Sequence, residues 1–279
     1  MSASVPRKGI TTPIERAPIR KGAIRMADIA PDVRQALNQG TIEAVTLVEA
    51  LVVDHGQLLR AIAADAGPET LAAMDATMDG KITSRMKRSG AVLYDRFGME
   101  EGLARFITHR SDTVRGWAAS IIGYAPGLKL PERLRLIAVL ADDPNPGTRE
   151  WAWMAVRPHI AADLERAIKL LTRWTAEPSA NLRRFATEST RPRGVWCAHI
   201  QALKHDPAIA LPLLDPLRAD PTKYVQDSVA NWLNDASKTQ PDFVVELCRS
   251  WLQTAPTKAT ERICRRAMRS LRAQNDRMK

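Results

Sequence analysis

Two glutamates and a group of arginines stand at spacings that can support chemistry. Glu150 and Glu188 are carboxylates, and a carboxylate can stabilise positive charge developing on a substrate or orient a water molecule. A guanidinium fits the oxygens of a phosphate group, and four arginines cluster nearby: Arg183, Arg184, Arg191 and Arg193. Spacing alone leaves a second interpretation open, in which these acids and arginines only pair with one another on a solvated surface.

The overall charge narrows the class of partner. The 279 residues include 41 Lys and Arg against 31 Asp and Glu, a net charge of +10 with an isoelectric point near 9.9. Such an excess favours a polyanionic partner, nucleic acid before a membrane. A hydrophobic content of 45% is normal for a globular protein and excludes the disordered and fibrous classes.

Metal, cofactor and membrane signals are missing from the sequence. Cys197, Cys248 and Cys264 have no metal-binding spacing to one another or to the five scattered histidines, so we expect no metal site and no disulfide framework. Apolar runs such as 136–141 are far shorter than the roughly 18 residues that span a bilayer, and no signal-peptide pattern opens the chain. We therefore expect a soluble cytoplasmic protein without a cofactor.

The chain divides into an arm and a helical body. Residues 1–30 are rich in arginine, lysine and proline, which predicts a mobile basic arm. From residue 31 onward, apolar side chains recur every three or four residues and no alternating strand pattern is found. We expect residues 31–279 to form one all-α body.

Internal repetition determines the fold class. Segments beginning at 110, 144, 178 and 221 align at intervals of 34, 34 and 43 residues, and three of the four begin with an acid and a proline. Proline ends one helix and the following polar residues begin the next, so each unit predicts a helix pair. Stacked pairs form an α-solenoid of HEAT-like repeats, clearest over 110–252. The tetratricopeptide signature is only faintly present.

One face of the repeat helices is polar where a purely structural layer would be apolar. In this register Glu150, Arg184 and Asp227 are equivalent, and Glu188 and Asn231 stand one turn later on the same face. This stripe is the candidate functional surface. Trp117, Trp151 and Phe185 share another position, which predicts core packing, whereas two tryptophans outside that alignment are candidates to flank a bound base: Trp153 and Trp196.

Two runs on these helices resemble a known family. Residues 181–196 (NLRRFATESTRPRGVW) and 224–238 (YVQDSVANWLNDASK) are similar to motifs of the AlkC/AlkD-like DNA alkylation-repair glycosylases, and more so to the AlkC branch. The resemblance implies a solenoid that binds duplex DNA and hydrolyses the N-glycosidic bond of cationic N3- or N7-methylated purines without flipping the base. It implies no metal or cofactor, and a cytoplasmic, nucleoid-associated monomer.

The resemblance also assigns roles to residues. It implies catalytic carboxylates at Glu150, Glu188 and Asp235. The DNA-binding set that we predict is Arg183, Arg184, Arg191, Arg193, Asn231, Trp153 and Trp196. The C-terminal arginines of 259–274 form a basic stripe that either lies along DNA or is only solvated. Two alternatives stay open: a catalytically inactive relative that binds distorted or branched DNA, and a HEAT-type scaffold for an acidic protein.

Overall fold

The computed structural model describes residues 20–277, and over this range the chain is all-α with no strand. The all-α class expected from the sequence is confirmed. The N-terminal helices are α1 (Pro31–Asn38), α2 (Leu47–Leu51), α3 (His55–Ile62), α4 (Pro68–Asp75) and α5 (Ile82–Phe106). The remaining helices are α6 (Asp112–Tyr124), α7 (Leu130–Ala141), α8 (Pro146–Ala162), α9 (Leu164–Leu171), α10 (Ala180–Glu188), α11 (Gln201–His205), α12 (Leu211–Leu214), α13 (Lys223–Ala236), α14 (Pro241–Thr254), α15 (Lys258–Ala267) and α16 (Arg269–Arg277).

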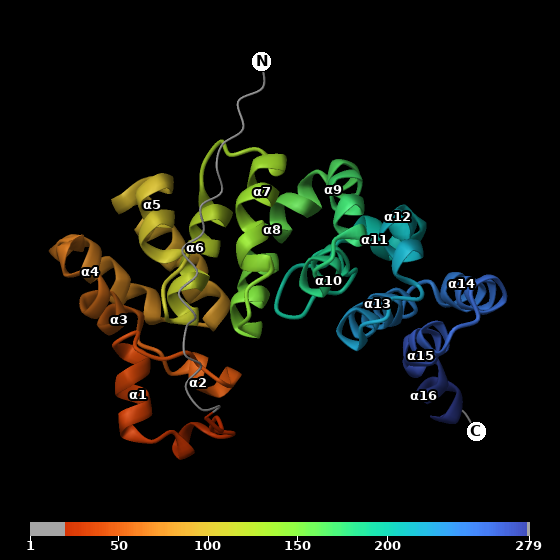
Figure 1. Ribbon diagram of the computed structural model, residues 1–279, viewed down its shortest axis with the longest axis horizontal. Helices are drawn as coiled ribbons and strands as arrows, with labels where there is room; N and C mark the ends of the chain where they lie inside the picture. Colours follow the sequence, from red (N-terminus) through yellow and green to blue (C-terminus); the bar gives the residue numbers. More distant parts are fainter. Residues whose placement is uncertain (1–19, 278–279) are drawn as a thin grey trace.

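The helices form an arch with two layers (Figure 1). One layer is the succession α6, α8, α10, α13 and α15, in which each helix packs against the next. Helices α7, α9, α12 and α14 cover its other side. Apolar side chains fill the space between the layers, and the predicted core positions Trp117, Trp151 and Phe185 are all buried, which confirms their packing role. The polar stripe predicted from the repeats therefore lies along a single layer.

An arginine in three of the four repeats, and a glutamine in the fourth, holds the loop that precedes its own helix. Arg115, Arg149 and Arg183 each donate from Nη1 to the two carbonyl oxygens six and five residues earlier, at 2.6 to 3.0 Å. In the fourth unit Gln226 donates to the carbonyl oxygen of Asp220, also six residues earlier, at 2.8 Å. These four residues are equivalent in the aligned repeats. These side chains recur because the carbonyl oxygens of the loops would otherwise have no hydrogen-bond donor.

The acid of the acid–proline pair joins one repeat to the next. Arg115 Nε donates to Asp143 at 2.7 Å, and Arg183 Nε donates to Asp220 at 2.6 Å. The other oxygen of each aspartate accepts from the backbone N–H two residues later, at 2.7 and 2.8 Å, where the next helix begins. The acid therefore starts one helix and fixes its distance from the previous one.

Part of the predicted N-terminal arm packs against α2. Residues 1–19 lie outside the described residues. Of the remainder, Arg20 pairs with the fully buried Glu49 through bonds of 2.5 and 2.7 Å, and Glu49 also accepts from the backbone N–H groups of Ala23 and Val45. Burial raises the pKa of Glu49, but these donors outweigh it and lower that pKa to about 2. Residues 20–30 are thus joined to the body through an ionised carboxylate.

A buried histidine lies in the N-terminal half. The His55 ring is fully buried, with Nδ1 2.8 Å from Ser89 Oγ and its edge toward the Trp117 ring, 5.6 Å between ring centroids. Burial lowers its pKa to about 4, and the nearby Arg85 acts in the same direction. The folded chain therefore holds this imidazole neutral at pH values where the unfolded chain protonates it.

We expect His55→Asn to flatten the pH dependence of stability. Between the unfolded pKa near 6.5 and the folded value of about 4, only the unfolded wild-type chain binds a proton at this site, so its stability falls as the pH falls through that window. Between pH 7.5 and pH 5 this loss amounts to roughly 2 kcal/mol, and the variant lacks it. Urea unfolding at the two pH values measures the difference, with the exposed His205→Asn as the control.

Candidate functional site

Five of the predicted site residues form one continuous set of ion pairs across three repeats. Glu150 on α8 contacts Arg184 on α10, Arg184 and Arg191 both contact Glu188, and Arg191 reaches Asp235 on α13. We call this set the acid–arginine ladder. It crosses the same helix layer in which the sequence placed the polar stripe, so the helix-pair register brings together residues that are up to 85 positions apart in the chain.

Arg184 is enclosed by its partners. Its Nη2 donates to Glu150 Oε1 at 2.6 Å and lies 3.6 Å from Glu188 Oε2. Its guanidinium carbon lies 4.6 Å from the centre of the Tyr224 ring, a cation–π arrangement. Only 13% of the side chain is exposed. The geometry gives Arg184 the work of holding two carboxylates, and the predicted contact with phosphate stays a prediction.

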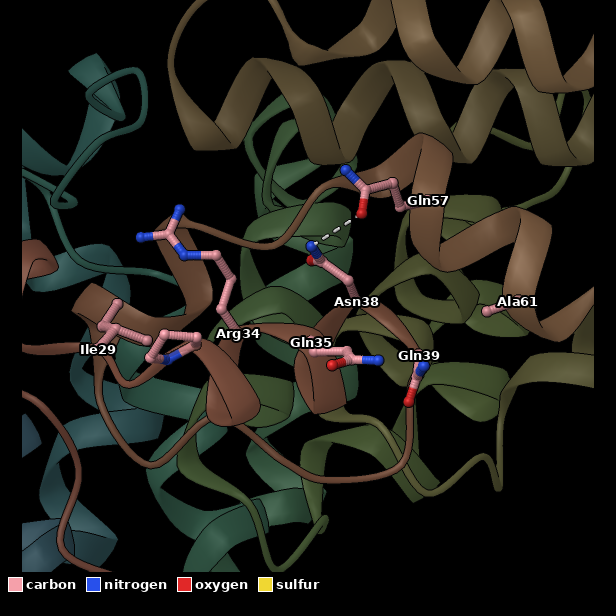
Figure 2. A pocket seen from close by; sticks show the side chains of 8 residues that line it. Ile29, Arg34, Gln35, Asn38, Gln39, Gln57 and Ala61 are labelled. Atoms are coloured by element: carbon pink, nitrogen blue, oxygen red, sulfur yellow. Dashed lines mark hydrogen bonds between the residues drawn. The ribbon is translucent and has the colours of Figure 1, made fainter.

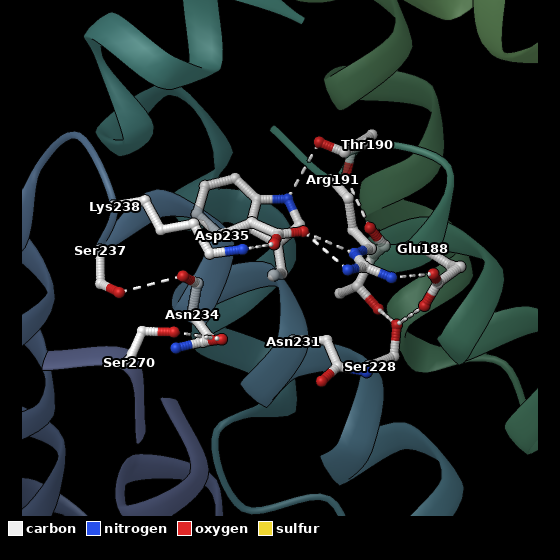
Figure 3. Close-up of polar contacts among 12 residues, drawn as sticks. Glu188, Thr190, Arg191, Ser228, Asn231, Asn234, Asp235, Ser237, Lys238 and Ser270 are labelled. Carbon is white, nitrogen blue, oxygen red and sulfur yellow. Dashed lines mark hydrogen bonds and ion pairs between the residues drawn. The ribbon is translucent and has the colours of Figure 1, made fainter. Parts of the chain in front are cut away.

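Arg191 bridges the two buried carboxylates of the ladder (Figure 3). It donates from Nη1 to Glu188 Oε1 at 2.7 Å and from Nε to Asp235 Oδ2 at 2.9 Å. Ser228 donates to the second oxygen of Glu188 at 2.8 Å, and Lys238 donates to the second oxygen of Asp235 at 3.1 Å. Each oxygen of the two acids therefore has a donor, which is what burial of a carboxylate requires.

The three carboxylates of the ladder differ in access to solvent. The side chains of Glu188 and Asp235 are 5% and 4% exposed, whereas that of Glu150 is 38% exposed. Burial opposes ionisation of Glu188, but Arg184 and Arg191 outweigh it and hold its pKa below the usual range. Glu150 accepts from Arg184 on one oxygen and from Trp153 Nε1, at 2.8 Å, on the other. Glu150 is thus the ladder carboxylate that a bound molecule reaches directly.

The loop after α10 carries an exposed tryptophan. Trp196 is 56% exposed and has a φ of 60°, the left-handed region that non-glycine residues rarely adopt. The buried Arg157 holds this loop, because its guanidinium donates to the carbonyl oxygens of Ser189, Arg191 and Ala198 at 2.6 to 3.4 Å. A strained aromatic fixed at the surface is a feature that functional loops often show.

The remaining predicted DNA contacts do not join the ladder. Arg183 forms the inter-repeat contact with Asp220 described above. Asn231 accepts from Arg269 at 3.0 Å. Among the side chains of residues 20–273, Arg193 has no ion-pair partner, and its Nε is buried without a hydrogen-bond partner. Trp153 is buried, with its indole N–H directed at Glu150, so its ring does not face solvent.

Four residues that complete the site were not predicted from the sequence: Arg157, Tyr224, Ser228 and Lys238. The last three stand on α13 or directly after it, in the run that already resembled the family, and their positions on the same helix face as Asp227 and Asn231 were the available signal. Arg157 had no such signal, because a buried arginine whose partners are carbonyl oxygens cannot be recognised from residue types.

Two hollows lie at the N-terminal end, away from the ladder. One, of about 620 Å³, is lined by residues of α1 and α3 with several amide side chains, among them Gln35, Asn38 and Gln57 (Figure 2). The second, of about 390 Å³, lies beside Arg20 and Glu49. Over the described part of the chain, no three His, Cys, Asp or Glu side chains gather as metal ligands. No helix within residues 20–277 has both the length and the apolarity to span a membrane.

Comparison with known proteins identifies the segment that carries the site. The model of a family described as DNA alkylation repair enzyme matches residues 147–271, from the start of α8 into α16. The resemblance to the DNA alkylation-repair family is confirmed. YhaZ of Bacillus subtilis, an uncharacterised protein, is 41% identical over 122 residues, which are 44% of this chain and 34% of YhaZ. The matched region is thus about a third of that relative.

Solved structures agree with the repeat fold. The alkylpurine DNA glycosylase AlkC of Pseudomonas fluorescens, solved bound to DNA containing an abasic site analog, has a TM-score of 0.63 at 24% identity over 86% of this chain and 62% of its own. AlkD2 of Streptococcus mutans has a TM-score of 0.57 at 20% identity over 72% of this chain and 96% of its own. These likenesses confirm the HEAT-like solenoid.

We expect Arg191→Met to destabilise the fold by about 3 kcal/mol near neutral pH, because it leaves two buried carboxylates with too few donors. Glu188 contributes stability above its ordinary pKa, and this contribution is lost as the pH falls, since its folded pKa is lowered. The difference between variant and wild type should therefore shrink below about pH 4.3. Urea unfolding measures it, and adding Glu188→Gln to the variant should restore part of the loss. Arg249→Met, on an exposed pair of α14, should change stability by less than about 0.5 kcal/mol.

Proposed function

We propose that this protein is a monofunctional DNA glycosylase that hydrolyses the N-glycosidic bond of cationic alkylated purines in duplex DNA. The observation that carries the proposal is the acid–arginine ladder, which sets three carboxylates on one helix layer within the segment that matches the alkylation-repair family. The proposed substrates are N3-methyladenine and N7-methylguanine.

The chemistry of such a substrate explains why carboxylates suffice. A purine methylated at N3 or N7 already carries a positive charge, so it leaves without protonation by a strong acid. The barrier that remains is the positive charge that develops on the deoxyribose as the bond to the base breaks. A fixed carboxylate stabilises that charge or orients the attacking water, as in glycoside hydrolysis.

Glu150 is the carboxylate that we place against the sugar. It is the most exposed of the three, and its two oxygens are held by Arg184 and Trp153, so it is fixed before the substrate arrives. Glu188 and Asp235 are enclosed by Arg191, Ser228 and Lys238. We assign them the work of fixing Arg184 and Arg191, and through Arg184 the position of Glu150.

The proposal includes a base that stays in the duplex. The ladder lies on the helix layer itself, and the two hollows described above lie beside α1, α2 and α3 instead. The exposed Trp196, in the loop that follows Arg191, suits contact with DNA from outside the base stack through its aromatic face. No metal or cofactor is needed for the proposed step, because the leaving group is activated by its own charge.

We expect Glu150→Gln to reduce release of methylated bases by a factor of ~10² to 10³ while duplex binding is kept or slightly improved. Glutamine retains the shape but lacks the charge that stabilises the sugar cation, and its neutrality removes repulsion with phosphates. Single-turnover release of N3-methyladenine from methylated duplex DNA measures the effect, with folding followed by circular dichroism. Glu246→Gln, a neutralised glutamate on α14, is the matched control and should release bases at the wild-type rate.

Other outcomes of this experiment are equally informative. Base release at the wild-type rate by Glu150→Gln, Glu188→Gln, Asp235→Asn and their combination would show that the carboxylates are misassigned. A wild-type protein that binds duplex DNA and releases no methylated base would point to the inactive DNA-binding relative, and one that binds no DNA would point to a scaffold.

A further inference from the structure

The positive charges of the ladder are neutralised by its own carboxylates. Its carboxylates are Glu150, Glu188 and Asp235, and the cations that contact them are Arg184, Arg191 and Lys238. Three negative charges therefore meet three positive charges. Arg184 and Arg191 are also 13% and 11% exposed. The surface that attracts a polyanion must therefore be sought elsewhere in the molecule.

The repeat register continues into a fifth unit beyond the four that align in the sequence. Pro256 and Thr257 stand before α15 as Pro221 and Thr222 stand before α13, and each threonine is the N-cap residue of its helix. The spacing between the two prolines is 35 residues. In this register, Asp227 and Asn231 of α13 correspond to two arginines of α15: Arg262 and Arg266.

In the fifth unit, the net charge of the polar stripe is therefore positive. Arg262 donates to Asp227 at 2.7 Å, and Arg266 lies 3.0 Å from the same carboxylate. Arg269, at the start of α16, donates to Asn231 at 3.0 Å. Three positive charges thus meet one negative charge, an excess of two. We call Arg262, Arg266 and Arg269 the arginine face, and 42% of the Arg266 side chain is exposed.

The arginine face is fixed beside the ladder. The buried Asn234 donates to the Ala267 carbonyl oxygen at 2.9 Å and accepts from Ser270 at 3.2 Å, so the junction of α15 and α16 is bound to α13 next to Asp235 (Figure 3). Burial lowers the pKa of Arg269, and the charge of Arg266 acts in the same direction. Cations crowded against one another in a fixed place have a strong attraction for a polyanion.

We propose that the arginine face binds the phosphate groups of the duplex to one side of the lesion, and that the ladder arginines Arg184 and Arg191 make no phosphate contact. The spacing suits a nucleic-acid strand. Arg262 and Arg266 stand one turn apart on α15, roughly 6 Å along its axis, which is close to the rise of two nucleotides, and Arg269 follows at the start of α16. The proposal rests on duplex DNA being the partner in the proposed function.

The structure thus separates affinity from chemistry. Phosphates bound by the arginine face at α15 and α16 would set the duplex across α13 and α10, where the ladder is. The carboxylates of the ladder repel phosphates, so they gain from having the backbone held at a distance by a neighbouring surface. A backbone contact also carries no base information, so the face should bind damaged and undamaged duplexes alike.

The test measures how binding of an undamaged, fluorescently labelled duplex depends on salt. Arg266→Gln and Arg269→Gln should each weaken binding several-fold and flatten the slope of log affinity against log salt by roughly 0.9, the loss of one phosphate contact. Arg249→Gln on α14 removes the same charge from an exposed pair on the other layer and is the matched control. It should keep the wild-type slope, and so should Arg184→Gln.

If Arg184→Gln folds poorly, a second variant still tests the proposal. Asp227→Asn removes the single negative charge from the arginine face and should tighten binding. The proposal is overturned if the Arg266 and Arg269 variants match the Arg249 control, or if Arg184→Gln flattens the slope. Tighter binding of an acidic polypeptide than of the duplex would also overturn it. If the slopes change as expected while the wild-type protein releases no methylated base, the arginine face stands and the glycosylase proposal fails.

Discussion

The site depends on one interaction, the guanidinium of Arg191 between Glu188 and Asp235. Burying two carboxylates on neighbouring helices is tolerated only because a planar cation satisfies both in a fixed geometry. Replacing all three by apolar residues would cost the fold little, since a buried ion pair gains less than it loses in desolvation. Stability alone therefore does not require this charged arrangement.

Pairs of an arginine and an acid have two different functions in the repeats. Arg115 with Asp143, and Arg183 with Asp220, join successive loops at the helix starts. Arg184 and Arg191 pair with acids further along the helices. The loop pairs fix the distance between units, and this distance determines whether side chains of α8, α10 and α13 can meet. The geometry of the ladder thus depends on the loop arginines. Adjacent residues have different roles for this reason: Arg183 fixes the spacing of the units, and Arg184 holds carboxylates of the ladder.

Repeat spacing and helical period are sufficient to predict the fold class and the stripe. Proline and polar residues at regular intervals determine where helices begin, and the helix period then fixes which residues share a face, so the sequence alone groups Glu150, Arg184 and Glu188. The partners of individual arginines could not be predicted. Arg183 and Arg184 have the same residue type, and only the direction of each side chain, toward a loop or along the layer, distinguishes them. Arg157 was missed because carbonyl oxygens, which every residue has, are its partners.

The fifth unit shows why a repeat can be missed when repeats are aligned from the sequence. Ala255–Pro256 lacks the acid that marks three of the four earlier units, and the preceding unit carries Gln226 at the position where the first three units carry the loop arginine. The net charge of the polar stripe thus changes along the arch. Acids and cations are balanced at the ladder, and cations are in excess at α15 and α16. A single repeat geometry, varied only in which charge each unit presents, thus accommodates both the carboxylate site that we propose for a cationic sugar and the cationic surface that we propose for its phosphates.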